Sequence, residues 1–243
     1  MVGHEFLAGW TSGAIGKFET VPSVEKRLKD FKWVRERTDL RTEKKFKLTS
    51  LIRLDERTIP FRKDILVLSG VVINEYISRP RKIEQTKDGV YRVIDGDPYV
   101  DIDFGQFWVT TRSIAVAQTS ETRTFTFTVL SQALGTETRA VKFDVGKIAQ
   151  DYGEHWLGSF QDRRGRMQSG TIYGNSVEQE ALIRGEYPRW KKNQVGFVTR
   201  HFGPPVKVKV TRDGVVVVYR DLYNDMSQYL RFVTEELLRY VSG

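Results

Sequence analysis

Cysteine is absent from this chain of 243 residues, which excludes a disulfide framework, a thiolate zinc site and a cysteine nucleophile. Histidine is scarce, and His4, His155 and His201 show neither metal-ligand spacing nor the pattern of a catalytic triad. No run of about 18 apolar residues occurs, so we expect no membrane-spanning helix and no membrane partner. Because the lack of cysteine suits a reducing compartment, we expect a cytoplasmic location, or a virion if the protein is an assembly subunit.

Few features divide the chain into segments. The N-terminal sequence MVGHEFLAGWTSGAIG has no basic n-region, so it is not typical of a signal peptide. Its glycines favour an extended arm over 1–20, and the Gly-rich stretch 12–16 lacks the Lys-Ser/Thr pair of a phosphate-binding loop. No repeat, low-complexity tract or clear linker divides the remainder. We therefore expect one β-rich domain over 21–243, with a soft boundary near 80–90.

Charge is unevenly distributed along the chain, whose formal net charge is +8. Segment 21–47 holds ten basic and five acidic residues, a net of +5, and segment 156–220 holds twelve basic and five acidic residues, a net of +7. Segment 94–105 holds four aspartates and no basic residue. Asymmetry of this kind indicates a polyanionic partner, and the alternative is ordinary surface charge that aids solubility.

Strands are predicted where apolar residues alternate with polar ones or form short runs. The segment 46–54 alternates, and 64–77 is a longer apolar run in which Gly70 indicates a bulge or a close backbone approach. Further strands are expected at 90–94, 99–104 and 107–118. The segment 21–36 is expected to be a helix, because its apolar residues recur at helical spacing after Pro22.

Two hairpins are predicted in the second half of the chain. In 122–129 threonine alternates with arginine or apolar residues, and 141–145 alternates again after a loop that contains Gly135. The second hairpin joins 206–210 to 215–220 through Asp213-Gly214, a strong turn sequence. The intervening segment 147–202 is interrupted by glycines and is expected to be largely irregular.

The last predicted element is a helix over 222–241, which carries an apolar stripe and can be capped by Asp221. A sheet with one apolar face needs such a cover. The expected fold class is therefore α+β: an antiparallel β-meander sheet with a long C-terminal amphipathic helix packed on one face.

Paired aspartates form the first candidate site. In a strand over 99–104, Asp101 and Asp103 point to the same face, and Asp95 and Asp97 lie close enough in sequence to add ligands. Carboxylates on one strand face are what a two-metal phosphoryl-transfer site needs to hold Mg²⁺ or Mn²⁺. The alternative is the ordinary solvent face of a strand, and no cofactor is expected unless the metal hypothesis holds.

The second candidate site is a basic stretch interleaved with aromatic residues, between Trp156 and the strand pair near 206. Arginine and lysine neutralise phosphates, and aromatic faces stack on unpaired bases. The candidate nucleic-acid-binding residues are Arg163, Arg164, Arg166, Arg184, Tyr187, Arg189, Trp190, Lys191 and Lys192. The alternative is that the aromatic residues belong to the core and the arginines to solvated loops.

Three hypotheses for function follow, and the non-enzymatic ones rank first. The leading one is a nucleic-acid-binding protein for DNA or RNA, in which the basic segments 26–47 and 163–192 merge into one surface. The second is a structural subunit of a large, phage-like particle that forms homo-oligomers or contacts assembly partners by strand addition. The third is the metal-dependent phosphoryl-transfer enzyme, and a ligand cavity between sheet and helix is a minor alternative.

Overall fold

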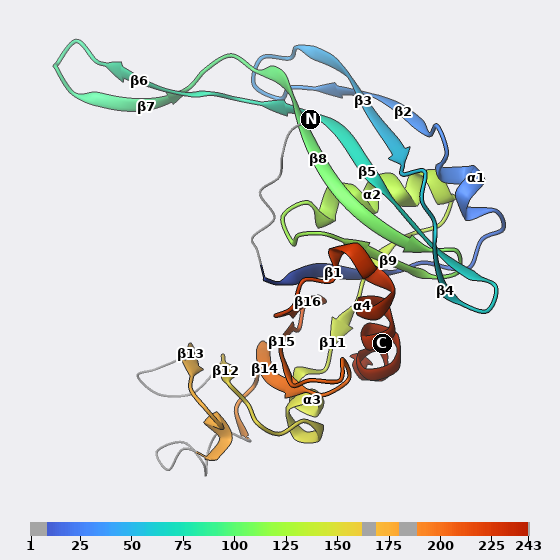
Figure 1. Ribbon diagram of the computed structural model, residues 1–243. Coiled ribbons are helices and arrows are strands. Elements are labelled where there is room, and N and C mark those ends of the chain that lie inside the picture. The colour runs from blue at the N-terminus through green and yellow to red at the C-terminus, as the bar shows by residue number, and fades with distance from the viewer. Residues whose placement is uncertain (1–8, 162–168, 180–188, 243) are drawn as a thin grey trace.

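The computed structural model describes residues 9–161, 169–179 and 189–242 (Figure 1). Most of the described chain is antiparallel sheet, and few helices accompany it. The strands of the main sheet are β1 (Thr11–Lys17), β2 (Lys32–Thr38), β3 (Lys45–Leu54), β4 (Ile59–Arg62), β5 (Ile65–Ser78), β8 (Tyr99–Thr110), β9 (Ile114–Ala117), β10 (Arg139–Ala140), β12 (Leu157–Phe160), β13 (Gly170–Tyr173), β14 (Gln194–Thr199), β15 (Val206–Thr211) and β16 (Val215–Val218).

Two small strand pairs and several helices complete the fold. The pairs are β6 (Arg81–Gln85) with β7 (Tyr91–Asp95) and β11 (Lys142–Phe143) with β17 (Val241–Ser242). The helices are α1 (Val24–Leu28), α2 (Arg123–Leu134), α3 (Val145–Asp151) and α4 (Met226–Phe232), with short turns η1 (Val177–Gln179), η3 (Tyr223–Asp225), η4 (Val233–Leu237, a π-helix) and η5 (Leu238–Tyr240). In the described part of the chain, none of these helices has the length and apolar character needed to cross a bilayer.

The strand order is β13-β12-β14-β15-β16-β1-β9-β8-β5-β3-β2, so the N-terminal β1 lies in the middle of the sheet. This order departs from the predicted meander, because β1 pairs with β16 on one side and with β9 on the other. We call β2, β3, β5, β8 and β9 the upper sheet, and β1 with β12 to β16 the lower sheet. Residues 11–17 of the expected N-terminal arm therefore join the two halves.

The two halves are covered by helices on opposite faces. Ala14 of β1 packs in a cluster with α1 and α2, whereas its neighbour Ile15 packs in a cluster with α3 and α4. Both residues are fully buried, because successive side chains of a strand point to opposite faces. Figure 1 shows the upper sheet arching over α2, with α4 beside the lower sheet.

The C-terminal helical run, from Tyr223 to Tyr240, closes the core of the lower sheet. It has α-helical geometry over Met226–Phe232 and continues as the π turn η4 and the 3₁₀ turn η5. The Tyr229 hydroxyl is buried and donates to the carbonyl of Val216 at 2.9 Å. Asp221 accepts a hydrogen bond from the Tyr223 amide at 3.0 Å, but Leu222 and Asp225 are the N-cap residues of η3 and α4, so the predicted capping role of Asp221 is wrong.

The hairpin predicted over 122–145 is wrong. Residues 123–134 form α2, and its buried Phe127, Leu130 and Leu134 are spaced three and four residues apart, which is the helical period. The Thr128 hydroxyl donates to the carbonyl of Thr124 at 2.7 Å, one turn earlier in the same helix. Gly135 ends α2 at φ +71°, a left-handed conformation that favours glycine.

Other predicted boundaries also change. The helix predicted over 21–36 ends at Leu28, and the alternating residues that follow form the edge strand β2. The strand β8 runs unbroken from Tyr99 to Thr110, where two strands were predicted. The segment 147–202, predicted to be irregular, contributes most of α3 and all of β12, β13 and β14 in its described part.

Several predicted strands are confirmed, namely 46–54 as β3, 64–77 as β5, 90–94 as β7 and the 206–220 hairpin as β15 and β16. Gly70 lies in a regular register between β3 and β8, so it marks a close approach rather than a bulge. A Cβ atom there would lie 2.4 Å from the carbonyl oxygen of Arg53. Gly214 closes the β15–β16 turn at φ +85°.

Candidate nucleic-acid interface

Most of the predicted nucleic-acid-binding residues are not among those that the structure describes. Arg163, Arg164, Arg166, Arg184 and Tyr187 lie outside the described ranges. Of the remaining four, Arg189 and Lys191 have exposed side chains. The Lys191 carbonyl accepts a hydrogen bond from the Gln161 amide at 2.9 Å, so its backbone extends β12 by one bridge.

Trp190 and Lys192 pack inward instead of facing solvent. The Trp190 ring is half-buried and lies 4.4 Å from the ring of Phe160, centroid to centroid. The Lys192 side chain is buried, and its ammonium is 3.5 Å from the carbonyl oxygen of Trp190. Burial lowers the pKa of Lys192. These two side chains therefore contribute to the structure of the lower sheet.

The aspartate pair has the predicted orientation, since Asp101 and Asp103 alternate along β8 and face the same side. The Asp101 carboxylate accepts hydrogen bonds from the hydroxyls of Tyr76 and Tyr99, each at 3.3 Å. Desolvation and the two carboxylates raise the pKa of Tyr76. Asp95 forms an ion pair with Arg41. Within the described ranges, no group of three or more His, Asp or Glu side chains is placed to hold a metal ion.

The two basic segments do not merge among the described residues. Segment 26–47 forms α1, β2 and the start of β3, and β2 is one end of the strand order. The described residues around 189–192 lie next to β12 and β14, near the other end. Figure 1 places these regions at opposite ends of the molecule.

The lower sheet nevertheless has an open face with cationic and aromatic side chains. We define its outer face as the side opposite α3 and α4. In β15, Val206, Val208 and Val210 point into the core, so Lys207 and Lys209 point to the outer face. The same alternation places Gly196 of β14 and Val217 of β16 on that face, through their pairing with Lys209.

A row of four aromatic rings crosses this outer face; we call it the aromatic row, and its members are Trp10, Tyr219, Trp156 and Tyr173. The Trp10 and Tyr219 centroids are 5.9 Å apart, those of Tyr219 and Trp156 are 5.2 Å apart, and those of Trp156 and Tyr173 are 6.5 Å apart. Tyr173 is 68% exposed, Trp10 38% and Tyr219 36%. Three of the rings therefore present surface to a ligand.

Trp156 lies in the aromatic row between Tyr219 and Tyr173, and contacts with β14 and β15 fix its position. Its indole covers Gly196, because a Cβ atom on that glycine would lie 2.6 Å from the ring. The indole N–H donates to the carbonyl of Phe197 at 3.2 Å. The ammonium of Lys207 lies 5.4 Å from the centroid of the same indole, which is the geometry of a cation–π contact.

Negative charge is absent from the strands that build this face. The sequences of β1 and of β12 to β16 contain Lys17, Lys207 and Lys209 but no aspartate or glutamate. Across the described residues, no carboxylate lies within 4.0 Å of the ammonium of Lys207 or Lys209. Burial, followed by the neighbouring Tyr173, raises the pKa of Tyr219, which keeps that phenol neutral. The face therefore carries the positive charge of its lysines beside neutral rings, with no anionic group on its strands.

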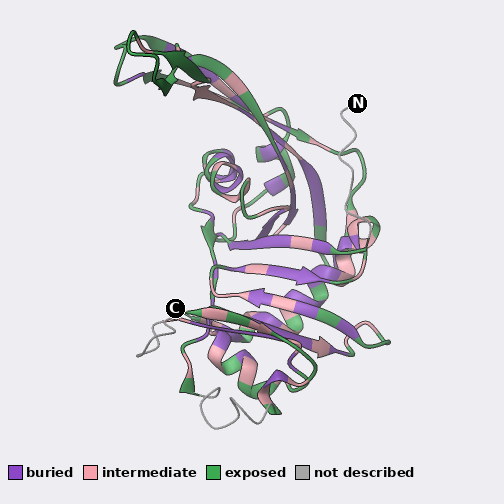
Figure 2. Cartoon of the chain, turned by 90° about the vertical axis from the view of Figure 1, so that its left-hand side faces the viewer, coloured by how far each residue is buried: buried purple, intermediate pink, exposed green. Residues whose placement is uncertain are grey.

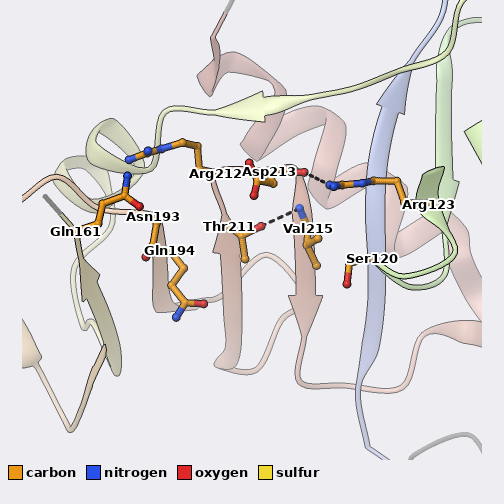
Figure 3. Close-up of a pocket in the computed structure, with 9 residues that line it drawn as sticks. All are labelled: Ser120, Arg123, Gln161, Asn193, Gln194, Thr211, Arg212, Asp213 and Val215. Atoms are coloured by element: carbon orange, nitrogen blue, oxygen red, sulfur yellow. Dashed lines mark hydrogen bonds between the residues drawn. The ribbon is translucent and has the colours of Figure 1, made fainter. Parts of the chain in front are cut away.

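A polar pocket of about 430 Å³ opens at the other end of the same strands (Figure 3). Arg123, from the first turn of α2, enters it beside Asp213 and donates to the Asp213 carbonyl at 2.5 Å. The pocket is lined by Ser120, Arg123, Gln161, Asn193, Gln194, Thr211, Arg212, Asp213 and Val215. Lys207 and Thr211 are four residues apart on β15, which places the pocket about 13 Å from the aromatic row.

Sequence reasoning placed Trp156 at the start of the basic, aromatic stretch and predicted none of the four rings of the aromatic row as a binding residue. The alternation in VKVKV indicates that Lys207 and Lys209 share a face, but nothing local relates them to Trp10 or Tyr219. Only the central position of β1 brings Trp10 to Tyr219. Comparison of the whole chain with protein-family models and with curated proteins finds no match.

Proposed function

We propose that this protein binds single-stranded nucleic acid, without catalysing a reaction, on the outer face of the lower sheet. The observation that carries the proposal is the aromatic row, which lies beside Lys207 and Lys209 on strands that contain no carboxylate. Bases stack on the exposed rings, and the two lysines neutralise the backbone phosphates. The polar pocket with Arg123 and Arg212 extends the cationic surface along the same strands.

Single strands suit this face better than a duplex. Base–aromatic stacking contributes about 1–3 kcal/mol per base, and it needs bases that are not paired in a helix. Trp10, Tyr219 and Tyr173 are the exposed rings of the aromatic row, so a strand that crosses the face can stack a base on each of them. Stacking does not require a particular base, so we expect little sequence preference.

The lysine contact favours a polyanion over a neutral oligosaccharide, which also stacks on aromatic rings. Lys207 adds positive charge at the centre of the aromatic row, and no described carboxylate neutralises it. Affinity that falls steeply as salt rises distinguishes the two ligand classes, because only the polyanion releases counterions on binding.

Fluorescence anisotropy with labelled oligo(dT) and oligo(rU) tests the proposal. We expect Tyr173→Ala to weaken binding by about tenfold, since it removes one exposed stacking ring. Tyr91→Ala is the matched control, because Tyr91 is also 68% exposed but lies on the β6–β7 hairpin. Equal affinities of the two variants would contradict the placement of the site.

The salt dependence tests the lysines separately. We expect Lys207→Gln to reduce the slope of log K against log salt by about 0.7, the value for one phosphate of a single strand. Lys63→Gln is a control at an exposed lysine away from this face. No binding of either oligonucleotide at low salt, or binding that does not depend on salt, would reject the proposed function.

A further inference from the structure

The β6–β7 hairpin and the adjoining part of the upper sheet expose apolar surface that a soluble subunit would bury against a partner. Every residue of β6 and β7 is exposed, and Figures 1 and 2 show the hairpin projecting away from the body. Ile83 is 75% exposed and Val93 is 66% exposed. A two-stranded hairpin is at best marginally stable on its own, so an arm of this kind gains stability from contact.

Beyond the end that α4 covers, the upper sheet has one face without a helix, which we call the uncovered face. On the other face α2 covers Val72 and Phe107, and the residues that alternate with these between 71 and 77 in β5 and between 100 and 106 in β8 remain half-buried or exposed. Phe104 and Ile102 are 49% and 48% exposed. The apolar residues of the uncovered face are Val34, Leu51, Val71, Ile73, Ile77, Val100, Ile102 and Phe104. Exposed apolar areas of this extent mark interaction surfaces.

Both edges of the upper sheet are open in the described part of the chain. On one side β2 pairs only with β3. On the other side β9 pairs with β8 only from Phe107 to Val109, so residues 99–105 of β8 have a strand partner on the β5 side alone. Unpaired strand edges are templates for the addition of another strand.

The two open edges carry opposite charge. The β2 edge contains Lys32, Arg35 and Arg37 against one acidic residue, and the β8 edge contains Asp101 and Asp103 without a basic residue. Arg35 is already bonded to Ser50 and Asn74 within the sheet, which leaves the exposed Arg37 available. Like charge along an edge discourages pairing with itself, whereas edges of opposite charge attract each other.

The charged residues also lie on matching faces. Arg37 and Asp103 both line the side of the upper sheet that faces α2. Val34 of β2 and Phe104 of β8 lie on the uncovered face. A strand-by-strand continuation in the register that opposes Arg37 and Asp103 would extend the apolar face from one copy to the next. The edges are on opposite sides of one sheet, so a single copy cannot join its own.

We propose that copies of this chain associate head to tail, with the β2 edge of one copy added to the open β8 edge of the next. Because this contact uses two different surfaces, it produces a ring if the rotation closes and a filament if it does not. The proposal concerns the upper sheet and is independent of the nucleic-acid site on the lower sheet.

Charge reversal tests the head-to-tail contact on the full chain. We expect Arg37→Asp and Asp103→Lys each to convert the wild-type oligomer to a monomer, measured by analytical ultracentrifugation. In a mixture of the two variants each contact again joins opposite charges, Arg37 with Asp103 in one and the two reversed side chains in the other, so the mixture should recover the oligomer. Glu121→Lys with Lys63→Asp, both at exposed sites, is the matched control that should assemble like the wild type.

Disulfide trapping gives a second readout, which the cysteine-free chain makes unambiguous. Opposed residues on neighbouring strands lie within disulfide reach, so oxidising a mixture of Arg37→Cys and Asp103→Cys chains should yield a covalent dimer of the two. Crosslinking of either variant with itself would indicate a symmetric contact and overturn the proposal. A wild-type chain that stays monomeric at high concentration, or an oligomer that neither charge reversal alters, would also overturn it.

Discussion

The lower and upper sheets each leave one face without a helix, yet the two open faces have different chemistry. The outer face of the lower sheet presents Lys207, Lys209 and the aromatic row. The uncovered face of the upper sheet presents aliphatic and phenyl groups beside an acidic edge. A cationic face with aromatic rings in edge contact can remain in water, whereas a broad apolar face favours burial against another protein surface.

The two open faces lie on opposite sides of the sheet because β1 joins its two halves and is covered by different helices on its two faces. Because α2 and α4 lie on opposite faces, the outer face of the lower sheet continues onto α2, and the uncovered face of the upper sheet continues onto α4. Arg123 in the first turn of α2 can therefore line a pocket with Thr211 of the lower sheet. One continuous sheet thus carries two open surfaces on opposite sides, and each can act without the other.

The core of the lower sheet and the projecting β6–β7 hairpin differ most in how tightly they are packed. Phe197 is fully buried and stacks on Tyr152, with ring centroids 4.1 Å apart. We expect Phe197→Ala to lower the free energy of unfolding by about 3–5 kcal/mol. Ile83→Ala in β6 should change it by less than about 0.5 kcal/mol. Urea denaturation measures both, and equal losses would show that the hairpin packs within the monomer.

Displacing the central indole should affect the outer face more than it affects the fold. A methyl group in Gly196→Ala would press on Trp156, and we expect the affinity for oligo(dT) to fall about tenfold through the loss of stacking. The cost in stability should be about 1–3 kcal/mol, as for other overpacked sites. Gly153→Ala is the control, because a Cβ atom there would meet no described residue within 4 Å other than its neighbours in the chain. Anisotropy and tryptophan emission report the change, and unaltered affinity would contradict a role for the aromatic row.

Acid should loosen the lower half before the upper half, because the two described histidines both lie there. His155 is buried and its ring nitrogen is 2.6 Å from the carbonyl oxygen of Tyr152. Desolvation lowers its pKa, while Glu178 acts in the opposite direction and Lys192 in the same direction.

The folded protein therefore holds His155 neutral at a pH where the unfolded chain binds a proton. The free energy of unfolding is not reduced by His155 above the unfolded pKa of about 6.5. Below that pH it falls, by at most about 1.4 kcal/mol per pH unit, because only the unfolded chain takes up the proton. Hydrogen exchange around η1 and β12 between pH 7 and 5 measures the effect. We expect His155→Gln to remove this pH dependence, and its persistence in that variant would assign it to another group.

Removing the projecting hairpin should have the smallest effect on the body. If 81–95 is replaced by a two-residue turn between Pro80 and Gly96, we expect the Tm to change by less than about 3 °C. Binding of oligo(dT) should stay within twofold of wild type, because the hairpin is remote from the aromatic row. A large loss of affinity would show that the two open surfaces are coupled.

Local sequence predicted those strands whose pattern has one interpretation. The alternation of VKVKV, the Asp-Gly turn and the apolar run 64–77 each agree with the strands observed. The segment 122–134 was ambiguous, since alternating Thr and Phe fit a strand over a few residues and a helix over a longer window. Packing of Phe127, Leu130 and Leu134 against the sheet selected the helix, which local alternation could not reveal.

The sequence by itself determined the absence of cysteine chemistry, the basic balance of the chain and the faces of individual strands, because these depend on composition and on a period of two. Only the tertiary structure decided which side chains meet. Trp10 and Tyr219 are separated by most of the chain, and they touch because β1 pairs with β16. Long-range strand pairing of this kind depends on the burial of both faces of β1, a property of the assembled sheet rather than of any short segment.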